Sequence, residues 1–302
     1  MNAIDRLLRR AAVRAGAPGG IRYTERQLYF ELCRMLLPLH RIPRRPAFTV
    51  PALMRYPDFQ SALGRHGPLP GLLEPAAPHP RLPGRHTPEP DLFDYGLPRL
   101  LVCESDAIAQ MLRANGLPME SACPVLSAAE LPLDPRVAHM LTLAGQATIY
   151  LLHDASAHGL TFPSRCAELT AIPAGVRVVP LGLRPRQAAA LHLAHVPAAC
   201  LADRSLQPSP RRADADPTAV RQDPPAAQRD PVDTGPSVRA TQPDPWERAW
   251  LRRAQCAEVE AVPPAILLRS VHRLVREVRP APSALTELRR ARTAGFLTWP
   301  AA

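Results

Sequence analysis

The sequence predicts an α/β protein in which a helical N-terminal part precedes a parallel sheet with flanking helices. Between residues 92 and 200, short apolar runs alternate with helical patterns, which is typical of parallel strands joined by helices. Before residue 66, by contrast, apolar residues recur at helical spacing. Two proline-rich segments, 67–91 and 201–245, lie on either side of the alternating region and interrupt both patterns.

Residues 1–66 are predicted to form three helices. The first covers 2–14, where the apolar side chains share one face. The second begins at Thr24, which forms a capping box with Gln27, and the third begins after Thr49. Three short helices in a basic segment of this size are compatible with a winged-helix-like domain, and equally with a helical cap on the next domain.

Residues 92–200 are predicted to form an α/β domain with a parallel sheet of four strands, near 100–103, 123–126, 147–152 and 175–181. Glu104 follows the first strand and Asp154 follows the third. Functional side chains of such sheets lie just past the carboxyl ends of strands, and two carboxylates there can hold Mg²⁺. A solvated glutamate and a helix-capping aspartate are the alternative interpretation.

The remaining segments are predicted from composition. Residues 67–91 are a Pro/Gly-rich linker, and 201–245 have almost no large apolar residue, which indicates a disordered insertion. Residues 246–302 are predicted to form C-terminal helices that pack on the α/β domain, with helices over 246–262, 264–278 and 283–294.

The charge of the chain is strongly basic, with a formal net charge of +10 from 37 basic residues, all of them arginine. This balance suits DNA as a partner, although an excess of arginine, alanine and proline also fits a general compositional bias. The six cysteines show no CxxC spacing, which argues against a zinc site. The absence of a secretory pattern and of a long apolar run predicts a cytoplasmic protein without a membrane partner.

The acidic positions form a recognisable pattern. A strand that ends in Glu104, followed much later by Asp154-Ala155-Ser156-Ala157-His158-Gly159, resembles the Toprim motif, in which the second part reads Asp-x-Asp-x-x-Gly. The resemblance implies a Toprim-like sheet with Mg²⁺ held by Glu104, Asp154 and position 156. Ser156 stands where the family has its second aspartate, which puts metal binding and catalysis in doubt.

Further segments resemble the A subunit of topoisomerase VI and its bacterial relatives, and the nuclease subunit of Wadjet-type systems is another relative. These segments are 24–30, 178–185 and 258–264. In the first, the family uses the second of two tyrosines to attack DNA. The matching residue here is Phe30, so Tyr29 is the remaining candidate nucleophile, or else a core residue. The last segment would bring Glu258 or Glu260 near the acidic site.

The resemblance implies a DNA-binding Toprim protein, similar to the A subunit of topoisomerase VI, that is catalytically degenerate. The alternatives are a Mg²⁺-dependent DNA nuclease that uses Glu104 and Asp154, and a non-enzymatic interaction protein with an eroded Toprim fold. We expect backbone phosphates to be contacted by four arginines, Arg26, Arg44, Arg45 and Arg55. A homodimer or a partner ATPase would fit the family, although the sequence itself indicates neither.

Overall fold

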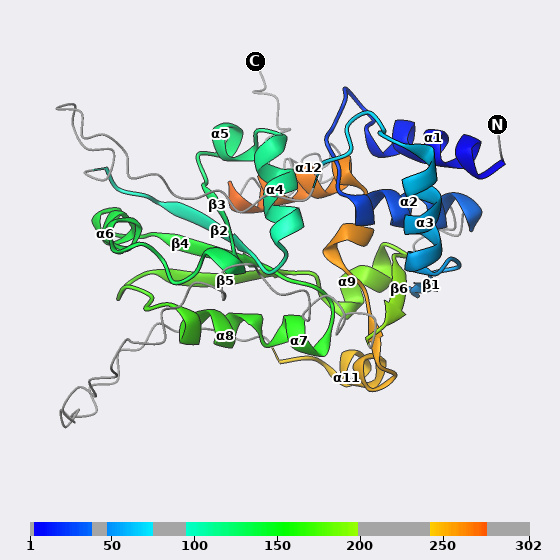
Figure 1. Cartoon of the computed structure of the whole chain (residues 1–302). Coiled ribbons are helices and arrows are strands. Elements are labelled where there is room, and N and C mark those ends of the chain that lie inside the picture. The colour runs from blue at the N-terminus through cyan, green and yellow to red at the C-terminus, as the bar shows by residue number, and fades with distance from the viewer. Residues whose placement is uncertain (1–2, 38–46, 75–94, 199–241, 277–302) are drawn as a thin grey trace, which may run out of the picture.

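A mixed α/β fold with a parallel sheet at its centre is seen in the computed structural model, which describes residues 3–37, 47–74, 95–198 and 242–276 (Figure 1). The sheet has the strand order β3-β2-β4-β5, and all its strand pairs are parallel. Its strands are β2 (Arg99–Cys103), β3 (Val125–Ser127), β4 (Thr148–Leu152) and β5 (Arg177–Gly182). The predicted parallel sheet is therefore confirmed, with each strand within about two residues of its predicted position.

The two central strands are buried on both faces. Successive side chains point to opposite sides of a strand, so Leu100 and Val102 enter one core, and Leu101 and Cys103 enter the other. The first core is covered by α6 (Pro135–Leu143) and α8 (Phe162–Leu169). The second is covered by α4 (Asp106–Ala114), α5 (Leu117–Ser121) and α12 (Pro264–Val275), on the opposite side of the sheet (Figure 1).

Three helices form the N-terminal part, as predicted: α1 (Ala3–Ala15), α2 (Glu25–Leu36) and α3 (Tyr56–His66). The capping box of Thr24 and Gln27 is present at the start of α2. The third helix begins later than predicted, because Val50–Pro51 form the short strand β1. The amide of Val50 donates to the carbonyl of Leu193, which ties this segment to a distant part of the chain.

A second, small sheet has the order β1-β6-β7, with β6 (Ala194–Pro197) parallel to β1 and β7 (Gln255–Cys256) antiparallel to β6. In the described part of residues 3–74, no β-hairpin wing follows the helices. The hydrophobic core also continues from α1 and α2 to α4 and α12. The N-terminal helices thus share their core with the large sheet.

The C-terminal part differs from its prediction. The helix expected over 246–262 ends early, as α11 (Pro245–Arg252), and Ala254 has a left-handed φ of 51° that no helix accommodates. The chain then forms β7 and a 3₁₀ turn, Val259–Ala261, before α12. The helix predicted over 283–294 lies outside the described residues, as do most of the linker 67–91 and nearly all of the insertion 201–245.

Two further observations concern the described residues as a whole. The five described cysteines are all buried and none forms a disulfide, namely Cys33, Cys103, Cys123, Cys166 and Cys256. Within the described residues, no helix combines the length and the apolar character needed to cross a membrane.

Candidate acidic site

The acidic site lies where the connections of the large sheet diverge. After β2 the chain passes through α4 to β3, on one face of the sheet. After β4 it passes through α7 (Ala157–Leu160) and α8 to β5, on the other face. The carboxyl ends of β2 and β4 therefore border the crevice in which ligands bind in open α/β sheets. Glu104 and Asp154 occupy these two ends.

Glu104 and Asp154 are neighbours because β2 and β4 are paired in register, with Cys103 opposite Leu152. The backbone amide of Asp154 donates to Oε2 of Glu104 at 3.2 Å. The expectation that these residues lie at adjacent strand ends is therefore met, and the two form one acidic pair.

A C-terminal segment, residues 257–262, lies across this pair. Ala257 and Ala155 exchange backbone hydrogen bonds of 2.9 and 3.1 Å, and the amide of Val259 donates to Oδ1 of Asp154 at 2.7 Å. Glu258 and Glu260 are fully buried here. The hydroxyl of Ser105 donates to Oε1 of Glu260 at 2.8 Å. The resemblance had suggested that this segment lies near the site, and it does.

Glu104 has an ion-pair partner that sequence reasoning missed. Nη2 of Arg165 donates to Oε1 of Glu104 at 2.5 Å and to the carbonyl of His158 at 3.2 Å. The guanidinium lies 5.4 Å from the centre of the Phe162 ring. His158 is farther from the carboxylate, with Nε2 at 3.7 Å from Oε1. The sequence signal that could have identified this partner is an arginine in the first helical turns after the Asp154 motif.

Ser156, the predicted third metal ligand, is the N-cap of α7. Its hydroxyl accepts a hydrogen bond from the amide of Gly159 at 2.8 Å, and the side chain is buried. Gly159 is required for a different reason. A Cβ at this position would lie 2.1 Å from the carbonyl oxygen of Asp154, so the backbone approach leaves no room for a side chain. The spacing from Asp154 to Gly159 is thus explained by packing and capping.

The arrangement fits a divalent cation poorly. Mg²⁺ requires near-octahedral coordination by oxygens at about 2.0–2.1 Å. Glu104, Asp154 and Ser156 each direct an oxygen to a donor of the chain itself. Among residues 3–37, 47–74, 95–198 and 242–276, no three His, Cys, Asp or Glu side chains gather into a possible metal site.

Burial shifts the pKa values of two further groups near the crevice, His153 and Cys256. It lowers the pKa of His153, whose Nδ1 lies 3.0 Å from the carbonyl oxygen of Asp154. Burial, followed by the charges of Asp154 and Glu258, raises the pKa of the Cys256 thiol. The imidazole is therefore neutral at pH 7, and the thiol is protonated, which makes it a poor nucleophile.

Tyr29 lies in the core, which was the alternative to its predicted role as a nucleophile. Its side chain is 2% exposed, and its hydroxyl donates to the carbonyl of Met54 at 2.6 Å. Its ring packs edge-on against Tyr56 and Phe59. Burial raises the pKa of Tyr29, so the phenolate is disfavoured. Phe30 is buried in the same cluster.

The arginines predicted to contact DNA have different surroundings. Arg26 forms a bidentate ion pair with the buried Glu258, with Nε at 2.5 Å from Oε2, and lies over the ring of Tyr56. Arg26 thus has a partner within the chain, and its contact with phosphate stays a prediction. Arg55 is exposed just before α3, whereas Arg44 and Arg45 lie outside the described residues.

A row of arginines on α1 was not singled out from the sequence. Arg6, Arg9 and Arg10 are exposed and share one helical face with Val13, opposite the buried Leu8. In the described part of the chain, none of these three arginines forms an ion pair with a carboxylate. Their spacing of three and four residues was the available signal.

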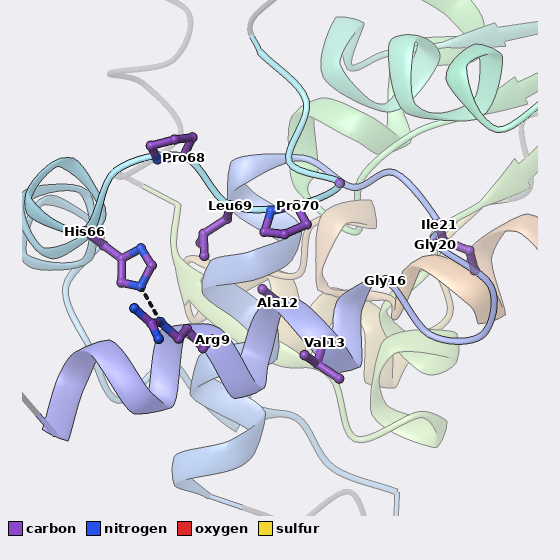
Figure 2. A pocket seen from close by; sticks show the side chains of 11 residues that line it. Arg9, Ala12, Val13, Gly16, Gly20, Ile21, His66, Pro68, Leu69 and Pro70 are labelled. Atoms are coloured by element: carbon purple, nitrogen blue, oxygen red, sulfur yellow. Dashed lines mark hydrogen bonds between the residues drawn. The ribbon is translucent and has the colours of Figure 1, made fainter. Parts of the chain in front are cut away.

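An apolar groove of about 620 Å³ adjoins this arginine row, between α1 and residues 66–71 (Figure 2). Arg9 lies at its mouth, where Nε donates to Nε2 of His66 at 3.3 Å. The rest of the lining is aliphatic, glycine or proline, such as Val13 and Leu69. The groove has no carboxylate and no pair of groups for acid–base chemistry, so the acidic crevice remains the candidate functional site.

Comparison with known proteins adds no information on the acidic crevice or on the arginine face of α1, so both are interpreted from their geometry. The crevice offers paired carboxylates at a switch point of the sheet, and α1 offers exposed cations. No family model, no curated protein and no solved structure matches the chain.

Proposed function

We propose that this chain is a DNA-binding Toprim protein, similar to the A subunit of topoisomerase VI, that does not cleave DNA. The observation that carries the proposal is the adjacency of Glu104 and Asp154 at the carboxyl ends of two paired central strands. Adjacent acidic residues are what a shared site of the Toprim type would require, so this adjacency supports the resemblance.

The proposal excludes cleavage because the groups that would perform it have other roles. Covalent attack needs a tyrosine hydroxyl within reach of DNA, but Phe30 has none and Tyr29 is buried against Met54. Metal-assisted attack needs carboxylate oxygens free to coordinate, but Glu104 is paired with Arg165. Ser156 supplies no negative charge.

DNA binding is proposed to use the outer face of α1. Arg6, Arg9 and Arg10 present three guanidinium groups along about one turn of helix, and each can contact a backbone phosphate without reading sequence. Arg55 is a further exposed candidate from the sequence prediction. Because the contacts are electrostatic, we expect weak sequence preference and strong dependence on salt.

Fluorescence anisotropy with a labelled duplex tests the DNA-binding part. The variant replaces three residues, Arg6→Gln, Arg9→Gln and Arg10→Gln, and its matched control removes equal charge from a different region, with Arg248→Gln, Arg252→Gln and Arg253→Gln on and just after α11. Loss of three phosphate contacts is expected to reduce the slope of log Kd against log salt by about 2–3, with little change in the control. Absence of wild-type binding at low salt would refute the proposal.

A plasmid-nicking assay tests the absence of cleavage. Wild-type protein and Glu104→Ala are incubated with supercoiled DNA and either Mg²⁺ or Mn²⁺. We expect no nicking by either protein. Nicking by the wild type that disappears in Glu104→Ala would instead establish the Mg²⁺-dependent nuclease alternative.

A further inference from the structure

The crevice contains a positive charge at the position where a metal-dependent relative needs a cation. Oε1 of Glu104 accepts a hydrogen bond from Arg165 at 2.5 Å, and Oε2 accepts one from the amide of Asp154 at 3.2 Å. Oδ1 of Asp154 accepts a hydrogen bond from the amide of Val259 at 2.7 Å. Both carboxylates of the pair are thus stabilised by donors of the chain itself.

We infer that Arg165 is a fixed internal cation that replaces the divalent metal at Glu104, so that the crevice is stable without Mg²⁺ and does not bind it. The inference rests on the proposed function, because only Toprim-type descent implies a metal at this position. On this inference, metal binding is prevented by the charge of Arg165 and not only by the presence of Ser156 in place of an aspartate.

Three contacts hold the Arg165 side chain beside Glu104. Its backbone belongs to α8, its guanidinium lies near the Phe162 ring, and the same Nη2 that pairs with Glu104 donates to the carbonyl of His158. Only 30% of the side chain is exposed.

A bound Mg²⁺ would compete directly with this pair. It would need an oxygen of Glu104 that Arg165 already holds, and it would place two further positive charges beside the guanidinium. Mg²⁺ also gives up its water ligands reluctantly, so two carboxylates and a capping hydroxyl offer little compensation. Removal of the guanidinium charge should therefore make the acidic pair available to a cation.

Titration of Mn²⁺ into the full chain, followed by electron paramagnetic resonance of the free ion, tests this inference. Arg165→Met removes the charge and keeps much of the aliphatic stem, whereas the control Arg165→Lys keeps a positive charge. We expect no binding that depends on Glu104 in the wild type or in Arg165→Lys. Arg165→Met should bind one Mn²⁺ at least tenfold more tightly than the wild type does. The double variant that also carries Glu104→Gln should lose that site.

Two results would overturn the inference. One is a single Mn²⁺ site in the wild type that disappears in Glu104→Gln, and the other is a folded Arg165→Met variant that binds Mn²⁺ no better than the wild type. If Arg165→Met does not fold, the wild-type Tm in Mn²⁺ and in EDTA decides. Equal values support the inference, and a Glu104-dependent rise in Mn²⁺ overturns it. DNA binding is measured in a separate assay, so a failure of the proposed DNA-binding function can be distinguished from a failure of the inference about Arg165.

Discussion

Charged side chains of the acidic crevice form ion pairs with one another, whereas arginines on the outer face of α1 are exposed to solvent. In the crevice, Glu104 is paired with Arg165, and Glu258 with Arg26, and both pairs are largely shielded from solvent. On α1, Arg6 and Arg10 project into solvent and form no ion pair within the described residues. The difference indicates that the charges of the crevice are engaged within the chain, whereas those of α1 remain available to a partner.

The largest expected effect distinguishes Arg26, which pairs with a buried carboxylate, from Arg10, which is exposed on α1. Arg26→Met leaves the fully buried Glu258 without its bidentate partner and should lower the free energy of unfolding by about 3–5 kcal/mol. Arg10→Met should leave stability unchanged and weaken DNA binding. Urea denaturation and anisotropy measure the two properties. A DNA-binding defect in Arg26→Met without loss of stability would contradict this distinction and support a phosphate contact by Arg26.

The second effect tests the packing of the acidic motif. Gly159→Ala places a methyl group 2.1 Å from the carbonyl oxygen of Asp154 and should cost about 3 kcal/mol, or roughly 10 °C in Tm. Gly64→Ala is the matched control, since a Cβ there meets nothing within 4 Å and the residue lies in α3. The control should be neutral or slightly stabilising. Calorimetry that finds Gly159→Ala as stable as the control would refute the close approach.

The third effect concerns the tyrosine segment. Tyr29→Phe removes the hydrogen bond to the Met54 carbonyl and should cost about 1–2 kcal/mol, with DNA binding unchanged when the protein is folded. Tyr95→Phe, at an exposed tyrosine, should have no measurable effect. The two variants are compared by urea denaturation. A loss of covalent DNA adducts in Tyr29→Phe alone would contradict the assignment of Tyr29 to the core.

The smallest effect is a pH dependence that arises beside the crevice. Burial lowers the pKa of His153, so the unfolded chain binds a proton more readily than the folded one below about pH 6.5. Stability is therefore complete above that pH and should decrease by about 1 kcal/mol from pH 7.5 to 5.5.

Thermal melts at the two pH values measure this decrease, and His153→Gln should reduce it. Part of the decrease should persist, because burial also lowers the pKa of His195. An identical decrease in His153→Gln and in the wild type would show that the buried histidine does not contribute.

Local signals in the sequence predicted local structure well. Thr24 and Gln27 identified the start of α2, because a capping box depends only on residues three positions apart. The apolar run before Glu104 identified β2, because a strand buried on both faces needs apolar residues throughout. The prediction failed after Arg252, where the chain leaves a helical pattern to pair with β6, more than fifty residues earlier.

The α/β class, the four parallel strands and the placement of Glu104 and Asp154 at strand ends could be read from the sequence, since they follow from periodicity along the chain. The pairing of Arg165 with Glu104 and of Arg26 with Glu258 is visible only in the folded chain. The same holds for the burial of Tyr29 and the exposure of the arginines of α1. A charge or hydroxyl acquires its role from the groups that surround it in space, and most of those groups are distant in sequence.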